Sequence, residues 1–210
     1  MRSGDVLHVL DSGGNAFEAV LTASEPLRAR LERALNAPRR STLEITLAQA
    51  IPKGQKMDFI VEKATELGVA RIIPLATERT IGSEARAGKL DRWRRLARSA
   101  AQQCGRRDVP DVEAVIGWDD FCARARDFER TFVPWELAER RPLRERLPAL
   151  LEGRRKIAIA IGPEGGFSQG EVERAEAAGA TTISLGHRIL RTETAGLVAC
   201  SLMLYASGDL

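Results

Sequence analysis

The chain has 210 residues, of which 44% are hydrophobic and 29% are charged, a balance typical of soluble globular proteins. No apolar run approaches the ~20 residues of a membrane span, and no charged-then-apolar leader opens the chain, so we expect neither a membrane protein nor a secreted one. Three widely separated cysteines and only two histidines argue against a metal site and favour the reducing cytoplasm, while a net charge of +3 does not by itself indicate nucleic acid.

Residues 1–40 differ from the rest of the chain and are expected to form a small N-terminal β module. Two strand-like runs, 5–10 and 16–22, flank a turn-forming segment, which predicts a β-hairpin. Residues 27–35 fit either a third strand or a short helix, and residues 37–41 are the best candidate for a linker. The module is too small to bury a core alone, so we expect it either to dock on the domain formed by 41–210 or to continue upstream of Met1.

A strand–helix–strand pattern begins after the linker. Residues 43–51 read as a strand, 56–67 as an amphipathic helix that ends before Gly68, and 71–76 as the next strand. Repeats of this kind predict an α/β fold with a mostly parallel sheet and right-handed crossovers.

Residues 86–107 are predicted to form a long helix with an unusual excess of positive charge. Basic side chains recur along one side, and a single acid, Asp91, opposes them. The basic residues are Arg86, Lys89, Arg92, Arg94, Arg95, Arg98, Arg106 and Arg107. They form either a solvated helix face or a cationic stripe that contacts a nucleic-acid backbone. We expect Trp93, on the same helix, to be a core residue rather than a platform for a base.

In the later part of the chain, two predicted strands are followed by loops rich in glycine or charged residues. Shorter elements come first: a strand at 112–116, a helix at 118–126, a strand at 131–135 and a locally helical excursion at 139–153. A strand at 157–161 then leads into the loop 162–166, and a strand at 181–185 leads into the loop 186–194. Ligands of open α/β sheets bind at the carboxyl ends of strands, so these two loops predict a pocket.

The first loop reads Gly-Pro-Glu-Gly-Gly over residues 162–166 and matches neither GxGxxG nor the P-loop pattern. Its glycines can let the backbone approach a ligand closely, although a tight turn without a ligand is the alternative. The carboxylate of Glu164 suits hydroxyls, an amino group or a cation better than a phosphate.

The second loop places charged residues beside an apolar helix predicted at 195–206. Arg188, Arg191 and Glu193 precede that helix, and Thr192 and Thr194 are expected to cap it. The helix is apolar enough that it must be buried or packed against a second subunit. Charges next to buried surface indicate functional groups, although Glu193 supporting the helix dipole is the alternative.

Five segments in order closely resemble the RsmE-type 16S rRNA uridine-N3 methyltransferases of the SPOUT class. They are PKGQKMDFIVEKATELGV, IIPLATERT, AQQCGR, IGPEGGFSQGEVE and LGHRILRTETA, which together extend from about residue 43 to the C-terminus. The first forty residues, including MRSGDVLHVLDSGG, resemble the back part of that family's PUA-like β-barrel, without its opening strand.

The resemblance implies an α/β domain with a deep C-terminal trefoil knot, a truncated N-terminal barrel module that docks RNA, and a homodimer formed through the knot and the last helix. It implies S-adenosylmethionine as cofactor and 16S rRNA or the small ribosomal subunit as partner. The implied cofactor contacts are Pro74, Leu75, Ala76, Gly162, Pro163, Glu164, Gly165, Gly166, Leu185, Gly186, Ile189, Leu190 and Ala195.

The roles of the remaining site residues are hypotheses. Arg191 would stabilise charge that develops on a uracil oxygen, and Glu193 would either orient Arg191 or accept the proton of N3. The residues expected to hold the RNA are Lys53, Lys56, Arg79, Gln103, Arg106 and Arg188. Two alternatives are a non-catalytic RNA-binding protein that keeps the knot fold and a nucleotide-binding α/β enzyme unrelated to methyl transfer.

Overall fold

The computed structural model describes residues 1–11, 15–35, 41–80, 88–138 and 142–210. The chain divides into two compact units: Met1–Arg40 together with Gly105–Asp108, and Ser41–Cys104 together with Val109–Leu210. The predicted linker at 37–41 and the hairpin turn at 12–14 fall almost entirely outside the described residues.

The first unit contains a three-stranded antiparallel sheet with the order β1-β2-β3. Its strands are β1 (Val6–Leu10), β2 (Ala16–Ser24) and β3 (Leu27–Leu35). The predicted hairpin is therefore confirmed, and residues 27–35 form a strand rather than a helix. Eight of the nine side chains of β3 are exposed, including the apolar Leu27 and Leu31, so its alternation of charged and apolar residues does not give it one buried face among the described residues.

The second unit is built on a seven-stranded sheet in which every strand pair is parallel. The order is β10-β8-β9-β4-β5-β6, and β7 also pairs with β5. The strands are β4 (Glu44–Ala50), β5 (Arg71–Ala76), β6 (Asp111–Val112), β7 (Ile116–Gly117), β8 (Arg130–Pro134), β9 (Lys156–Ile161) and β10 (Thr181–Ile183). The predicted parallel α/β sheet is confirmed.

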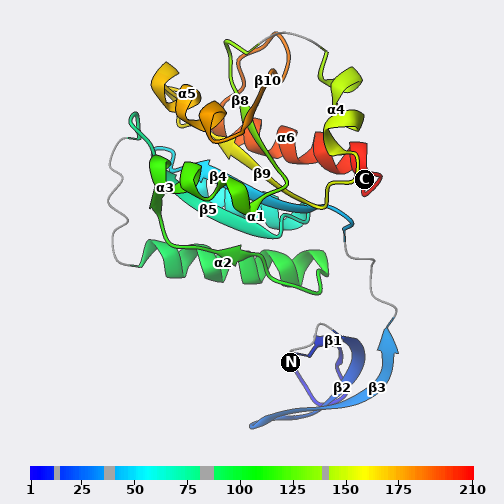
Figure 1. Ribbon diagram of the computed structural model, residues 1–210. Coiled ribbons are helices and arrows are strands. Elements are labelled where there is room, and N and C mark those ends of the chain that lie inside the picture. The colour runs from blue at the N-terminus through cyan, green and yellow to red at the C-terminus, as the bar shows by residue number, and fades with distance from the viewer. Residues whose placement is uncertain (12–14, 36–40, 81–87, 139–141) are drawn as a thin grey trace. The chain divides into compact units, whose positions relative to one another are not determined.

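Helices cover both faces of this sheet (Figure 1). One face carries α1 (Lys56–Glu66), α2 (Lys89–Cys104), α4 (Leu143–Leu151) and α6 (Thr192–Ser207), and the other carries α3 (Trp118–Ala123) and α5 (Gln169–Ala177), with a short 3-10 turn at Ala125–Asp127. The alternation along β9 explains the two layers: its isoleucines pack in the core with α6, and Ala158 and Ala160 pack in the core with α3 and α5. Trp93 is buried in the first core, as expected.

Several boundaries differ from the predictions. The strand expected at 112–116 is two short strands, β6 and β7, each paired with a different part of β5. Helix α2 ends at Cys104 because Gly105 adopts a positive φ of 73°, so Arg106 and Arg107 are not helical. Its predicted start falls partly outside the described residues, which removes Arg86 from the description.

Helix α6 begins three residues earlier than predicted, at Thr192. Its N-cap residue is Arg191, with no side-chain cap, so the expectation that Thr192 or Thr194 caps the helix is wrong. The hydroxyl of Thr192 instead bonds to Gln49 and Gly162.

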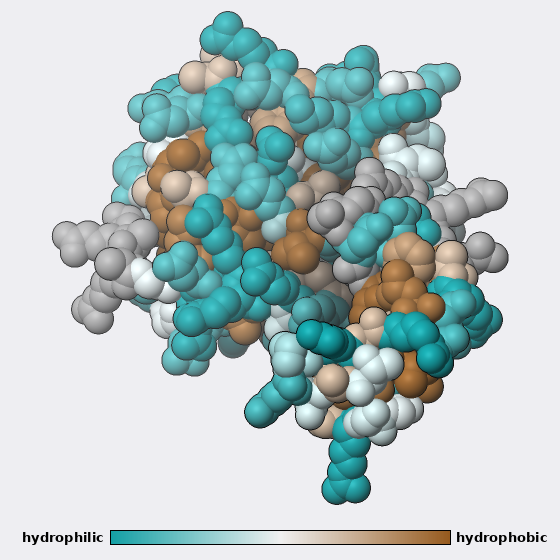
Figure 2. Space-filling view, turned by 90° about the horizontal axis from the view of Figure 1, so that it is seen from below, coloured by the Kyte–Doolittle hydropathy of each residue, from teal (hydrophilic) through white to brown (hydrophobic). Residues whose placement is uncertain are grey.

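None of the helices in the described part of the chain is long and apolar enough to span a bilayer. The surface seen in Figure 2 is largely hydrophilic, with apolar residues in smaller patches.

Candidate active site

Because all strands of the large sheet run the same way, their carboxyl ends meet at one edge, and the loops after β8, β9 and β10 enclose a cavity there. The cavity has a volume of about 440 Å³, which lies within the range of about 300–1,000 Å³ usual for ligand sites. It shares five lining residues with a second cavity of about 120 Å³. The larger cavity is lined by Lys56, Pro134, Glu136, Ile161–Phe167, Ile189–Thr192 and Ala195.

The loop after β9 needs its glycines for steric reasons. A Cβ added at Gly162 would lie 3.1 Å from the carbonyl carbon of Gly166 and from the backbone nitrogen of Phe167. Gly166 adopts a φ of 67°, and its N–H donates to the carbonyl of Pro163 at 2.9 Å. The loop therefore folds back tightly on itself, and its three glycines present backbone rather than side chains to the cavity.

A capping box holds the far end of the same loop. Ser168 and Glu171 exchange side-chain and backbone hydrogen bonds at the start of α5. Buried Glu171 also accepts a hydrogen bond from the backbone N–H of Glu78 at 2.8 Å, and Arg79 Nη1 donates to the carbonyl of Gly165 at 2.7 Å. These bonds fix the loop after β9 to the loop after β5.

A chain of hydrogen bonds holds Gly162, the first residue of the loop after β9. Gln49, at the end of β4, donates from Nε2 to Thr192 Oγ1 at 2.8 Å. Thr192 Oγ1 in turn donates to the carbonyl of Gly162 at 2.6 Å. The start of α6 is thereby tied to both β4 and the first residue of the glycine loop.

Lys56, the first residue of α1, connects two carboxylates at the rim of the cavity. Its Nζ lies 2.9 Å from Glu164 Oε1 and 3.4 Å from Glu193 Oε2. The hydrogen bond with Glu164 is the main reason that the pKa of Lys56 is raised. Burial of Glu164 raises its pKa, but the hydrogen bonds from Lys56 and from the N–H of Lys53 outweigh burial, so the pKa lies below its ordinary value. Both Lys56 and Glu164 therefore stay charged near neutral pH.

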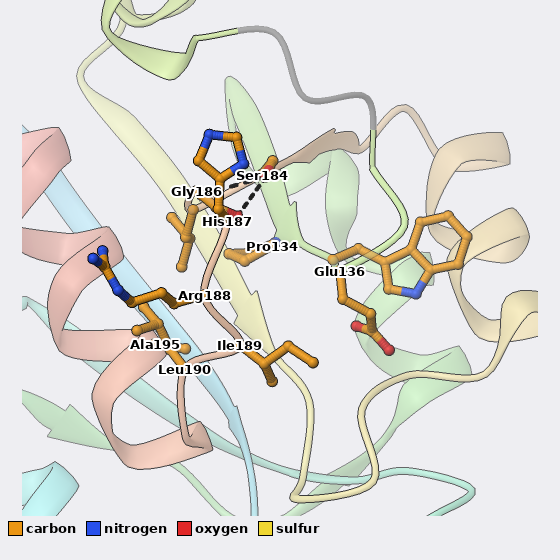
Figure 3. A pocket seen from close by; sticks show the side chains of 11 residues that line it. Pro134, Glu136, Ser184, Gly186, His187, Arg188, Ile189, Leu190 and Ala195 are labelled. Atoms are coloured by element: carbon orange, nitrogen blue, oxygen red, sulfur yellow. Dashed lines mark hydrogen bonds between the residues drawn. The ribbon is translucent and has the colours of Figure 1, made fainter.

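The loop after β10 is held much more loosely. Within it, Ser184 Oγ exchanges hydrogen bonds of 3.3 Å with the backbone of Gly186 (Figure 3). The side chains of Arg188 and Arg191 are exposed and make no hydrogen bond or ion pair with any described residue, and Ile189 is 89% exposed. The arginines are therefore available to a ligand.

Most of the predicted site residues are brought together here. Gly162–Gly166, Leu185, Gly186, Ile189, Leu190 and Ala195 line one or both cavities, and so do Lys56, Arg188 and Arg191. Lys53 and Arg79 contribute through their bonds to the glycine loop. Glu193 is next to the cavity, paired with Lys56, and among the described residues its side chain makes no ion pair or hydrogen bond with that of Arg191.

Three predicted cofactor contacts do not line either cavity. Pro74, Leu75 and Ala76 are in β5, two strands away from β9, and the side chains of the first two are buried. Their strand contributes to the site through its exit loop, where Arg79 reaches Gly165.

Two predicted RNA contacts are placed elsewhere. Gln103 is at the end of α2, in a groove with Glu62, Lys63 and Glu66 of α1. Helix α1 leaves the carboxyl edge of the sheet and runs toward the amino edge, so Gln103 is remote from the cavity within this chain. Arg106 belongs to the first unit, with Gly105–Asp108, and its guanidinium pairs with Asp108 at 3.1 Å.

The sequence analysis missed Pro134, Trp135 and Glu136, which line the smaller cavity. They follow β8, a third strand that ends at the same edge, so the apolar run before Trp135 was the signal available. The buried Gln49 was also missed, since nothing in its own strand marks it. The sequence pattern Ser-x-x-Glu at 168–171 is typical of a capping box.

The arrangement suits a small ligand with both polar and charged groups. Backbone atoms of two loops, the acidic residues Glu136 and Glu164 and two exposed arginines line the ligand space. The described residues include no cluster of three His, Cys, Asp or Glu side chains that could hold a metal ion.

Comparison with known proteins adds to this geometry. Residues 39–204 match the sequence profile of a family described as RNA methyltransferase domain. The chain is 34% identical over 176 residues to ribosomal RNA small subunit methyltransferase E of Bacillus subtilis, covering 81% of this chain and 69% of that protein. It is 34% identical over 205 residues to the protein of the same name from Synechocystis, covering 95% of this chain and 65% of that protein.

A solved structure is similar over nearly the whole chain. A methyltransferase from Legionella pneumophila, in complex with its bound cofactor SAM, has a TM-score of 0.86 and 33% sequence identity. The similarity covers 98% of this chain and 85% of that one.

Proposed function

Since this chain belongs to the family of RNA methyltransferase domains, we propose that it methylates N3 of a uridine in small-subunit (16S) ribosomal RNA, with S-adenosylmethionine as the methyl donor. The observation that carries this proposal is the cavity enclosed by the loops after β8, β9 and β10. The names of the curated relatives and the bound cofactor of the Legionella protein support it.

The residues present fit that cofactor. The glycines at 162, 165 and 166 leave a floor without side chains, and the carboxylate of Glu136 is available to a positively charged ligand. When bound, S-adenosylmethionine supplies an electrophilic methyl group. The protein must then hold the uridine in line with that group, a task of positioning.

Uridine N3 carries a proton that must be removed before the nitrogen can attack. Arg191, exposed at the N-terminus of α6, would stabilise the negative charge that develops on a uracil oxygen. Glu193 would accept the proton, since its ion pair with Lys56 and not with Arg191 favours this role over that of orienting the arginine.

Exposed cations near the cavity would hold the RNA backbone. Lys53, Arg79 and Arg188 are next to the site, and Arg95 and Arg98 of α2 are exposed without a described partner. The N-terminal unit, as part of a PUA-like barrel, would add to RNA docking. Gln103 has no role in this proposal, because it lies in the groove between α1 and α2. Arg106, in the first unit, stays a predicted RNA contact.

The expected knot and dimer also remain proposals. Residues 135–155 connect β8 to β9. The segment 184–187 shares one cavity with residues 134–136, at the start of that connection, and another cavity with residues 142–144, farther along it. A chain threaded past that connection would make both contacts. Leu202 and Tyr205 of α6 are exposed and would be covered in a homodimer. The reaction would take place in the cytoplasm.

Two measurements test the function. Calorimetric titration with S-adenosylmethionine is expected to show one site per chain, and mapping of modified nucleotides is expected to show one methyluridine that depends on the protein. If neither S-adenosylmethionine nor S-adenosylhomocysteine binds, the proposal is wrong. Binding of RNA without binding of the cofactor would support the non-catalytic alternative.

A further inference from the structure

The cavity contains two carboxylates with different surroundings. Glu164 is neutralised by Lys56, which also pairs with nearby Glu193. Glu136 lines both cavities and makes no ion pair or hydrogen bond with any described residue. Among the cavity-lining carboxylates of the described chain, Glu136 is therefore the one without an ion-pair or hydrogen-bond partner.

The backbone around Glu136 is shaped to admit its carboxylate. Glu136 follows β8, and a Cβ added at Gly166 would lie 3.2 Å from Glu136 Oε1 and 3.5 Å from Oε2. Any side chain at 166 would thus crowd the carboxylate. Figure 3 shows the carboxylate of Glu136 and the side chain of Ile189 reaching toward the same space from opposite sides. The charge is presented to the ligand space next to an apolar surface.

The methyl donor and the product of the proposed reaction differ by one charge. S-adenosylmethionine contains a positively charged sulfonium, and S-adenosylhomocysteine contains a neutral thioether in its place. Their adenosine, amino and carboxyl groups are the same. A carboxylate beside the sulfur therefore distinguishes the two, whereas a carboxylate beside the amino group does not.

We propose that Glu136 is a specificity-determining residue that makes the site prefer the sulfonium cofactor over its neutral product. This inference rests on the proposed function and deepens it. The replacement of bound product by a new cofactor molecule would be favoured, because the favourable interaction with Glu136 is present before methyl transfer and absent after it. Glu136 would have no part in removing the proton from the base.

The test compares binding of three ligands to the wild-type protein and to Glu136→Gln by calorimetry. The ligands are S-adenosylmethionine, S-adenosylhomocysteine and sinefungin, in which a carbon that bears a protonated amino group replaces the methylated sulfur. For a partly exposed charge pair we expect Glu136→Gln to weaken S-adenosylmethionine and sinefungin by about three- to tenfold and to leave S-adenosylhomocysteine within about twofold. Glu136→Asp should retain part of the preference, and high salt should reduce the preference of the wild type.

A matched control is Glu152→Gln. Glu152 is exposed at the end of α4 and lines neither cavity, so the same change in net charge should leave all three affinities unchanged. Thermal unfolding of each variant checks that the fold is retained.

The outcomes separate the two proposals. If Glu136→Gln weakens all three ligands equally, Glu136 contacts a group common to them, and the inference is wrong. The inference also fails if all three affinities are unchanged. In both cases the proposed function survives, because it depends on binding of S-adenosylmethionine to the wild-type protein and on the methylated nucleotide, and neither result concerns Glu136.

Discussion

The loops after β9 and β10 line the same cavity, but they are held in different ways. The loop 162–166 is fixed by three side chains and one backbone N–H from four other elements or loops, through Gly162, Glu164 and Gly165. The loop after β10 makes few such bonds and exposes Ile189 and two arginines. The first loop is preorganised for the ligand, and the second leaves its side chains free to act on the ligand. Substitutions in the two loops should therefore affect different properties.

The largest effect is expected in the loose loop. Arg191→Ala should lower methylation turnover by about 10²- to 10³-fold, the usual cost of removing a group that stabilises developing charge. The melting temperature and the affinity for S-adenosylmethionine should stay near wild type, because the side chain has no described partner. Single-turnover methylation, calorimetry and thermal unfolding measure the three quantities. Unchanged turnover would contradict the role of Arg191.

In the fixed loop, Gly162→Ala should lower both stability and cofactor affinity. The added methyl group would lie 3.1 Å from backbone atoms that cannot yield, so we expect a loss of about 1–3 kcal/mol in the free energy of unfolding. Gly170→Ala is the matched control, since its Cβ would meet only Arg174 Nη1 at an ordinary 3.5 Å. Urea unfolding measures both variants, and equal stability of the two would show that the loop adapts.

Thr192→Val keeps the shape of the side chain and removes its hydroxyl. The carbonyl of Gly162 then loses its bond from Thr192, and the amide nitrogen of Gln49 keeps only its bond to the carbonyl of Ala50, at a cost of about 1–2 kcal/mol. Thr192→Ser restores the hydroxyl and should recover most of the stability and of the cofactor affinity. The fixed-loop interpretation would be refuted if Val and Ser variants had the same affinity.

The smallest effect is expected for Lys56→Met, which removes the ion pairs with Glu164 and Glu193. Lys56 and its main partner Glu164 are both partly exposed, so the melting temperature of the variant at pH 7 should fall by only about one degree. The pKa of Glu164 is lowered in the folded protein, so the stabilisation is present above the ordinary pKa of glutamate and lost as the pH falls through the lowered value. The difference between variant and wild type should therefore narrow in acid.

The control for this pair is Lys63→Met. Lys63 also contacts two glutamates, Glu62 and Glu66, but it does so on the exposed side of α1. Its loss should leave cofactor affinity unchanged, whereas Lys56→Met should reduce it. A reduction of the same size in both variants would mean that the effect is one of net charge.

Local patterns in the sequence predicted the elements better than their ends. The apolar run at 157–161 and the amphipathic spacing at 56–67 specify β9 and α1 almost to the residue. Helix α2 was predicted too long, because the break at Gly105 depends on a positive φ that a charged flanking sequence does not reveal. The cap of α6 was misassigned, because Thr192 finds buried partners in distant segments.

The candidate site was predictable only in part, for a related reason. The glycine loop and Arg191 follow strands whose apolar runs are evident in the sequence. Glu136 and Gln49 enter the site because β8 and β4 both lie beside β9, and that order of strands is a property of the whole sheet. Gln103 was assigned to the site from a segment whose helix runs to the opposite edge.

The sequence alone determined the parallel α/β architecture and the two loops that line the cavity, because hydrophobic periodicity and glycine spacing are local properties. The tertiary structure alone decided which side chains meet at the cavity. It joined Lys56 to Glu164 and Glu193, placed Thr192 between Gln49 and Gly162, and left Glu136 without an ion-pair partner among the described residues. These outcomes depend on contacts between residues roughly 30 to 140 positions apart, and such contacts form only when the strands have taken their order in the sheet.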